Sequence, residues 1–149
     1  MTPKFTLVPS AYFSEGNARE LLSKVVLLDD GEPLSFVEVP AYKAVLVYSG
    51  RRPEVYDMMM SLCKVKSYNK LIVAMVDGFL HMVVAQGDDL VFCNCFSAPD
   101  QTTAEYYIFM TLKRLQINPE ISTIYFYSAV PQDTLVSFCR YFKSAEVLQ

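Results

Sequence analysis

The sequence predicts a mixed α/β (α+β) fold whose sheet contains an antiparallel three-strand meander followed by alternating helices and strands. Three apolar stretches succeed one another over residues 71–96, with tight turns between them. An amphipathic stretch follows over residues 100–118, and then a short apolar run and a second amphipathic stretch. A meander followed by such an alternation is typical of a mixed sheet with helices packed against it.

The part before residue 50 predicts three short strands and one helix. The strands are expected at residues 5–9, 34–39 and 44–48. Ser14 is a suitable N-cap for the helix, and Glu15 lies in the first turn, where the helix dipole favours negative charge. The apolar positions of this helix recur at helical spacing: Ala18, Leu21, Leu22, Val25 and Val26.

A second helix is expected to begin at Pro53, because proline is favoured at the first helical position. We expect it to turn four side chains inward: Tyr56, Met59, Met60 and Cys63. The polar stretch 64–70 that follows is the best candidate for a boundary within the chain. We therefore expect one unit over residues 1–149, in which residues 71–149 form a subdomain.

The clearest passage predicts strands at residues 71–76, 79–86 and 90–96. Asp77 and Gly78 form the first turn, since both central positions of a type I′ turn need positive φ. Asp100 then caps a helix that Asn118-Pro119 ends. A strand at 124–127, a helix opened by Pro131 and a strand at 146–148 complete the order β-β-β-α-β-α-β, which is that of the ribonuclease-H-like unit.

Composition excludes several classes of protein. The apolar share is 52% and the charged share 19%, so disorder is excluded. The net charge of -3, without any large basic cluster, argues against a nucleic-acid partner. Apolar runs are too short to span a bilayer and the start lacks the pattern of a signal peptide, so we expect no membrane partner. Four scattered cysteines indicate a reducing compartment, and we expect a cytoplasmic location.

Several motifs resemble those of an uncharacterised family of Bacteroidetes proteins. They are residues 5–10 (FTLVPS), 17–21 (NAREL), 94–96 (NCF) and 103–107 (TAEYY). The similarity runs along the whole chain, and none of its motifs is catalytic. The family is assigned an actin-like ATPase fold, and its members are longer. The resemblance therefore implies a fragment that lacks most of a first ribonuclease-H-like subdomain.

The actin-like fold implies where a nucleotide would bind. Its phosphates are cradled by hairpin turns, which places Asp77 and Gly78 at the phosphate and Ser128 near the base. Phosphate turns need small or hydroxyl residues so that backbone N–H groups can approach the oxygens. Here Phe79 and Leu80 follow the turn, and the stretch around Ser128 has no glycine. We therefore expect a non-catalytic member of the fold, with ATP binding as the alternative.

Other candidate sites have simpler explanations. His81 is the only histidine, and no nucleophile stands at a suggestive spacing from it. Cys93 and Cys95 point to one face of a strand, yet a zinc site needs four ligands, so buried thiols explain them better. Asp88-Asp89 and Asp100 are explained by a solvated turn and a helix cap. We expect no catalytic residue, no metal and no cofactor.

A protein-contact surface is the remaining hypothesis. Methionine and tyrosine are favoured at adaptable protein surfaces. Met58, Met59, Tyr106 and Tyr107 lie on helices expected to be neighbours. The sequence thus predicts a non-catalytic domain for protein interaction or scaffolding, with another protein or a second copy of the chain as partner.

Overall fold

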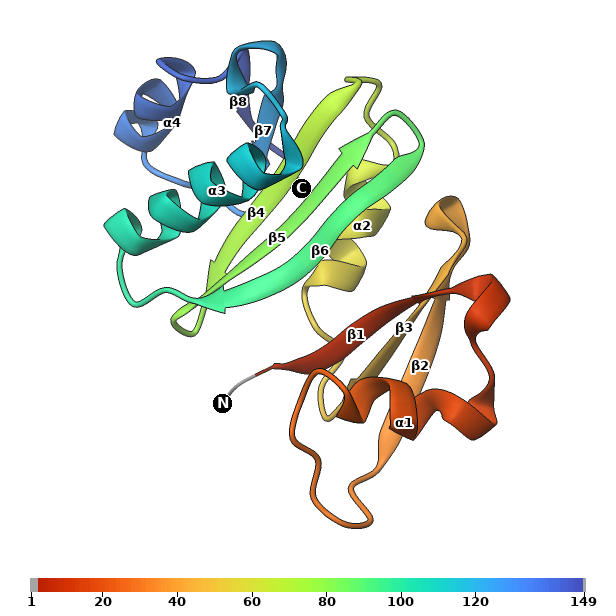
Figure 1. Cartoon of the computed structure of the whole chain (residues 1–149). Helices are drawn as coiled ribbons and strands as arrows, with labels where there is room; N and C mark the ends of the chain where they lie inside the picture. The colour runs from red at the N-terminus through yellow and green to blue at the C-terminus, as the bar shows by residue number, and fades with distance from the viewer. Residues whose placement is uncertain (1–2, 149) are drawn as a thin grey trace.

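The computed structural model describes residues 3–148 and contains two sheets with helices between and outside them (Figure 1). From one side to the other, the layers are α1, a three-stranded sheet, α2, a five-stranded sheet, and the pair α3 and α4. Among residues 3–148, no helix is both long and apolar enough to cross a bilayer.

The three-stranded sheet comes from the first third of the chain and is antiparallel. Its order is β1-β3-β2, with β1 at Lys4–Pro9, β2 at Leu34–Val39 and β3 at Ala44–Ser49. Val45 and Val47 of β3 face α1 (Ala18–Ser23), whereas Leu46 faces α2. Both faces of this sheet are therefore covered, as the apolar run of β3 requires. Short 3-10 turns lie at Ser10–Tyr12, Glu15–Asn17 and Pro40–Tyr42.

Helix α1 is shorter than the sequence pattern suggests. Ser14, expected to cap the helix, instead caps the 3-10 turn Glu15–Asn17, where it forms a capping box with Asn17. The helix begins after this turn, at Ala18, and ends at Ser23. Val25, expected on its inner face, is 61% exposed. Two consecutive β-branched residues, Val25 and Val26, favour helix weakly and lie where the chain turns away.

The five-stranded sheet has the order β6-β5-β4-β7-β8. The meander strands β4, β5 and β6 pair antiparallel, while β7 joins β4 and β8 joins β7 in parallel. This mixed sheet confirms the predicted fold class. Its strands are β4 at Asn69–Val76, β5 at Phe79–Gln86, β6 at Asp89–Ser97, β7 at Thr123–Phe126 and β8 at Ser144–Val147.

Three helices cover the two faces of this sheet. Helices α3 (Gln101–Leu115) and α4 (Gln132–Cys139) lie on one face, and α2 (Val55–Leu62) lies on the other (Figure 1). A 3-10 turn at Pro119–Ile121 links α3 to β7. Leu71 and Val73 of β4 point to α3 and α4, and Ile72 and Ala74 point to α2. Burial on both faces explains why residues 71–74 of β4 are all apolar.

The inner face of α2 differs by one residue from the expected face. The fully buried positions recur at helical spacing: Val55, Met58, Met59 and Leu62. Tyr56, Met60 and Cys63 are only partly buried, so the expectation for these three is wrong. The helix lies between two sheets, and its inward direction could not be known before both sheets were placed. Its first turn also starts two residues after Pro53.

Candidate functional site

The hairpin turn between β4 and β5 has the conformation that its sequence predicts. Asp77 and Gly78 have φ angles of 51° and 79°, as a type I′ turn requires. The backbone N–H of Ala98 donates to the carbonyl of Gly78 at 2.8 Å, which ties the turn to the end of the meander. The turn thus holds its own hydrogen bonds without any ligand.

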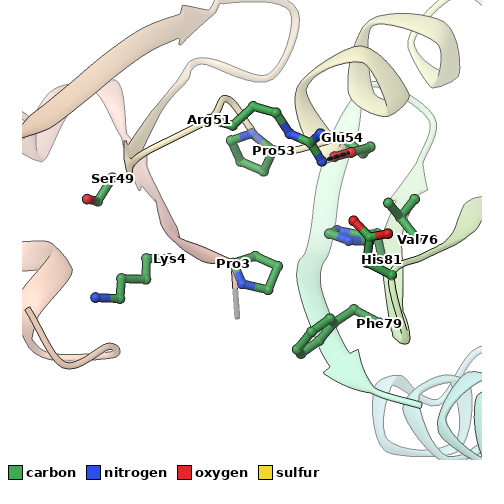
Figure 2. Close-up of a pocket in the computed structure, with 10 residues that line it drawn as sticks. Pro3, Lys4, Ser49, Arg51, Pro53, Glu54, Val76, Phe79 and His81 are labelled. Carbon is green, nitrogen blue, oxygen red and sulfur yellow. Dashed lines mark hydrogen bonds and ion pairs between the residues drawn. The ribbon is translucent and has the colours of Figure 1, made fainter. Parts of the chain in front are cut away.

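A cavity of about 300 Å³ lies beside this turn, where the two sheets approach one another (Figure 2). The hairpin contributes Val76, Asp77, Phe79 and His81 to its wall. The opposite wall comes from the first part of the chain and the start of α2: Pro3, Lys4, Ser49, Arg51, Pro53 and Glu54. We call this space the junction cavity.

His81 is the buried polar group of the junction cavity. The residue is 2% exposed, and its Nδ1 atom has no hydrogen-bond partner. Burial lowers the pKa of His81, and Arg51 acts in the same direction, whereas Glu54 and Asp77 oppose the shift. The ring is therefore held toward its neutral form, in which one nitrogen donates and the other accepts.

The two cations of the cavity are already paired with carboxylates. Arg51 contacts Glu54 at 2.8 Å (Figure 2), and Lys4 contacts Glu32 at 3.0 Å. The Ser49 hydroxyl and the Asp29 backbone N–H also donate to Glu32, and with Lys4 they lower the pKa of Glu32 to about 2. Asp77 adds a further carboxylate. The cavity therefore carries little free positive charge with which to hold a phosphate.

Ser128 lies in a different cavity from Asp77. This second space, about 200 Å³, opens between the ends of β4 and β7 and the helices α3 and α4. Its wall near Ser128 is formed by Ala129, Val130 and Pro131. Asp77 lines only the junction cavity and Gly78 lines neither. The structure therefore does not place these three residues in one cavity.

The expected methionine and tyrosine surface is wrong in two respects. Met58 and Met59 are fully buried between the two sheets. Helices α2 and α3 also lie on opposite faces of the five-stranded sheet, so their side chains cannot form one surface (Figure 1). Tyr107 is half-buried and stacks on Phe96, with ring centroids 4.5 Å apart. Only Tyr106, at 62% exposed, stands on the surface.

Tyr106 nevertheless belongs to an exposed aromatic surface that we did not predict from the sequence. A hollow of about 300 Å³ between α3 and the chain that leaves α4 is lined by five residues. We call them the tyrosine surface: Thr102, Glu105, Tyr106, Phe109 and Tyr141. The first four recur at helical spacing, on a face of α3 that adjoins its buried face, which was a usable signal. Tyr141 carried no such signal because it approaches from the end of α4.

Cys93 and Cys95 are poor nucleophiles here. Burial raises the pKa of Cys93 to about 12, with Cys95 adding to the shift, and burial also raises the pKa of Cys95. Thiols with raised pKa react slowly because the thiolate is the nucleophile. Within residues 3–148, no three His, Cys, Asp or Glu side chains are grouped closely enough to hold a metal ion. Cys139, unlike the others, is exposed.

Comparison with known proteins places the chain in a family. The model of a family described as "Protein of unknown function (DUF3822)" matches residues 54–143, which is more than half of the chain. The chain belongs to the DUF3822 family. The matched residues begin at the start of α2 and end just before β8, so they include the five-stranded sheet apart from its last strand.

The fold of this DUF3822 protein is similar to that of a solved structure of another protein. It is a crystal structure from Bacteroides thetaiotaomicron, described as a protein with actin-like ATPase fold and unknown function. The TM-score is 0.78 at 15% sequence identity, and the match covers 98% of this chain and 65% of that chain. The resemblance inferred from the sequence is thereby confirmed for the fold. The chain spans 65% of the length of that structure. No curated protein matches the sequence.

Proposed function

We propose that this DUF3822 protein is a non-catalytic member of the actin-like fold that binds another protein through the tyrosine surface. The observation that carries the proposal is the pair Tyr106 and Tyr141, which are 62% and 53% exposed and line one hollow together with Phe109. Aromatic side chains combine a large apolar area with a polar end, and they are enriched at the centres of protein interfaces.

The geometry of the tyrosine surface suits a binding role. Phe109 forms its floor and touches Tyr141 edge to face, with centroids 5.3 Å apart. Phe109 also stacks on Phe138, whose ring is buried in the core. Phe109 is therefore held by contacts with the core, whereas Tyr106 and Tyr141 are largely exposed. A pre-organised aromatic hollow loses little conformational entropy when a partner side chain enters.

The chemistry of the remaining groups supports a non-catalytic role. The thiols of Cys93 and Cys95 have raised pKa values. The cations beside the hairpin turn are paired with Glu32 and Glu54. These features oppose both nucleophilic attack and phosphate binding.

Site-specific photo-crosslinking tests the proposal. A photoreactive amino acid replaces Tyr106 in the cell of origin, and crosslinked products are identified by mass spectrometry. Tyr12, which is 73% exposed on the three-stranded side, is the control position. We expect one discrete partner from position 106 that is lost when Tyr141→Ser is added, and none from position 12. Equal products from both positions, or none from 106, would contradict a binding role for this surface.

Nucleotide binding is the second candidate, and one observation favours it. The junction cavity adjoins the hairpin turn, and one of its lining residues is buried His81, whose Nδ1 has no hydrogen-bond partner. A ligand that supplies a hydrogen-bond partner there would remove the cost of that unpaired atom. Thermal unfolding with and without millimolar ATP and Mg²⁺, with an Asp77→Ala variant alongside, tests this candidate.

The two outcomes of the ATP experiment differ clearly. A ligand at about 100 times its dissociation constant stabilises a protein by roughly 2.7 kcal/mol, which is a shift of several degrees for this length. A shift that disappears in Asp77→Ala would support nucleotide binding. An unchanged melting temperature in a cooperatively unfolding protein would reject it and leave the protein-contact proposal in place.

A further inference from the structure

The free edges of the two sheets lie beside one another. Strand β1 is the outer strand of the three-stranded sheet and pairs only with β3. Strand β6 is the outer strand of the five-stranded sheet and pairs only with β5. A groove of about 310 Å³ separates the two strands, and Figure 1 shows β1 and β6 at the meeting point of the sheets.

The groove is lined by strand edges rather than by strand faces. Its walls are residues 5–7 of β1 and residues 90–94 of β6, with Val25 at one side. Successive side chains of a strand point to opposite faces. A space that touches three and five consecutive residues must therefore be approached from the edge, where the unpaired backbone N–H and C=O groups point.

The lined stretches of these edges lack two of the usual protections against pairing, charged side chains and proline. Exposed strand edges are normally blocked by charged side chains, especially lysine, or by proline. Every residue that lines this groove is uncharged, and none is proline. The charged residues Lys4 and Asp89 stand at the ends of the two strands, outside the lined stretch.

The pairing of β5 with β6 adds a local feature to this edge. Val84 pairs with Phe92 and Ala85 pairs with Leu90, so Val91 is an extra residue in β6. Such a bulge increases the twist of its strand and re-aims the side chain. Val91 is 36% exposed in the wall of the groove, where it offers an apolar contact.

We propose that this groove binds an extended, uncharged segment of a partner protein, which adds a strand to β6 alongside β1. The backbone groups of the two edges would give affinity, as in other complexes formed by strand addition. The five lined residues of β6 extend over roughly 13 Å at the usual strand rise, which suits a segment of about five residues. The uncharged wall selects apolar and β-branched side chains, because a charged group would lose its hydration there.

This site is separate from the tyrosine surface, so the two proposals can fail independently. The groove is built from β1 and β6, whereas the tyrosine surface is built from α3 and the end of α4. Neither set of lining residues includes a member of the other. A variant in one site leaves the other site intact.

The experiment uses the full chain and a displayed library of random linear peptides. The selected peptides are synthesised, their affinity is measured by fluorescence anisotropy, and amide hydrogen exchange is followed with and without peptide. We expect uncharged, β-branched or aromatic peptides that protect residues 5–7 and 90–94. Protection elsewhere, or the absence of any peptide that protects these edges, would overturn the proposal.

Charged variants at the edge give a matched test. Thr6→Lys and Val91→Lys place a lysine in the groove, and we expect each to weaken peptide binding by about tenfold or more. Ser35→Lys places the same charge on β2, the other edge of the three-stranded sheet, and should leave the affinity unchanged. Circular dichroism checks that each variant is folded. Equal losses in all three folded variants would overturn the assignment to this groove.

A second copy of the chain is the competing occupant. Analytical ultracentrifugation over a range of concentrations, combined with hydrogen exchange, distinguishes it from a peptide segment. We expect residues 5–7 and 90–94 to exchange at the same rate in dilute and concentrated protein. Dimerisation that protects these residues would show that the groove pairs copies of the chain, and it would overturn the peptide proposal.

Discussion

The rings of Phe96 and Tyr107 lie face to face, with centroids 4.5 Å apart and planes inclined by 9°. Phe96 belongs to β6 and Tyr107 to α3, so this contact joins the outer strand of the meander to the helix that follows it. Phe92, on the same strand, also stacks on Phe96, with ring centroids 6.0 Å apart. All three rings pack against the core beneath α3 and α4.

The stacked pair should contribute more to the free energy of unfolding than its buried area alone would give. We expect a double-mutant cycle with Phe96→Leu and Tyr107→Leu to give a coupling of about 0.5–1.5 kcal/mol, the usual value for aromatic pairs. Urea unfolding of the wild type, both single variants and the double variant measures it. Phe96→Leu combined with Tyr12→Leu is the control, and these two changes should be additive. If the losses of unfolding free energy from Phe96→Leu and Tyr107→Leu simply add, the stack contributes no coupling energy.

Adjacent methionines of α2 should differ sharply in their importance. Met59 is fully buried between the two sheets, whereas Met60 is only partly buried. We expect Met59→Ala to lower the free energy of unfolding by about 2–5 kcal/mol, because it leaves a cavity in the core. Met60→Ala, with the same chemistry, should lower it by less than about 1 kcal/mol. Equal losses in urea unfolding would contradict the position of α2.

The Gly78 turn tests backbone strain separately from packing. Gly78 has a φ of 79°, and a Cβ atom there would meet nothing within 4 Å. Gly78→Ala should therefore destabilise the protein through its left-handed backbone alone, by about 1–2 kcal/mol. Gly16 also has open space around it but no positive φ. Gly16→Ala should be neutral or stabilising by up to about 1 kcal/mol, and thermal unfolding of both variants checks the difference.

His81 should make stability depend on pH near neutrality. Burial lowers the pKa of His81 in the folded state, so below about pH 6.5 the unfolded chain takes up a proton more readily. The wild type should lose stability as the pH falls from 8 to about 5.5, above the range in which most carboxylates titrate. His81 is the only histidine, so His81→Leu should flatten this slope. The test is to measure urea midpoints of the wild type and of His81→Leu between pH 8 and about 5.5. If the midpoints of both proteins depend on pH with the same slope, His81 is not the cause.

The locally determined parts of the fold were predictable from the sequence. Strand β5 runs from Phe79 to Gln86 as expected, and Asp77 and Gly78 adopt the positive φ angles of the turn. The Asp100 side chain accepts a hydrogen bond from the backbone N–H of Thr103 at 2.7 Å, which is the predicted cap of α3. These features depend on interactions between residues close in the chain, so local sequence patterns predict them.

The candidate site was less predictable. Tyr106 was expected at a surface and is exposed, but Met58 and Met59 are buried and Tyr141 was not anticipated. A three-methionine run has the same helical pattern whether one side of the helix or both meet a sheet. Likewise, no spacing rule relates Lys4 and Arg51 to His81, although all three line the junction cavity.

By itself, the sequence determined the strands, the turns and the amphipathic helices of this DUF3822 protein, and hence the class of its fold. Only the tertiary structure decided that α2 lies between two sheets, that Asp77 and Ser128 line separate cavities, and that the edges of β1 and β6 meet at a groove. The physical reason is the range of the interactions. Hydrogen bonds of turns and caps act over a few residues, whereas the burial of apolar faces joins segments far apart in the chain and is non-directional.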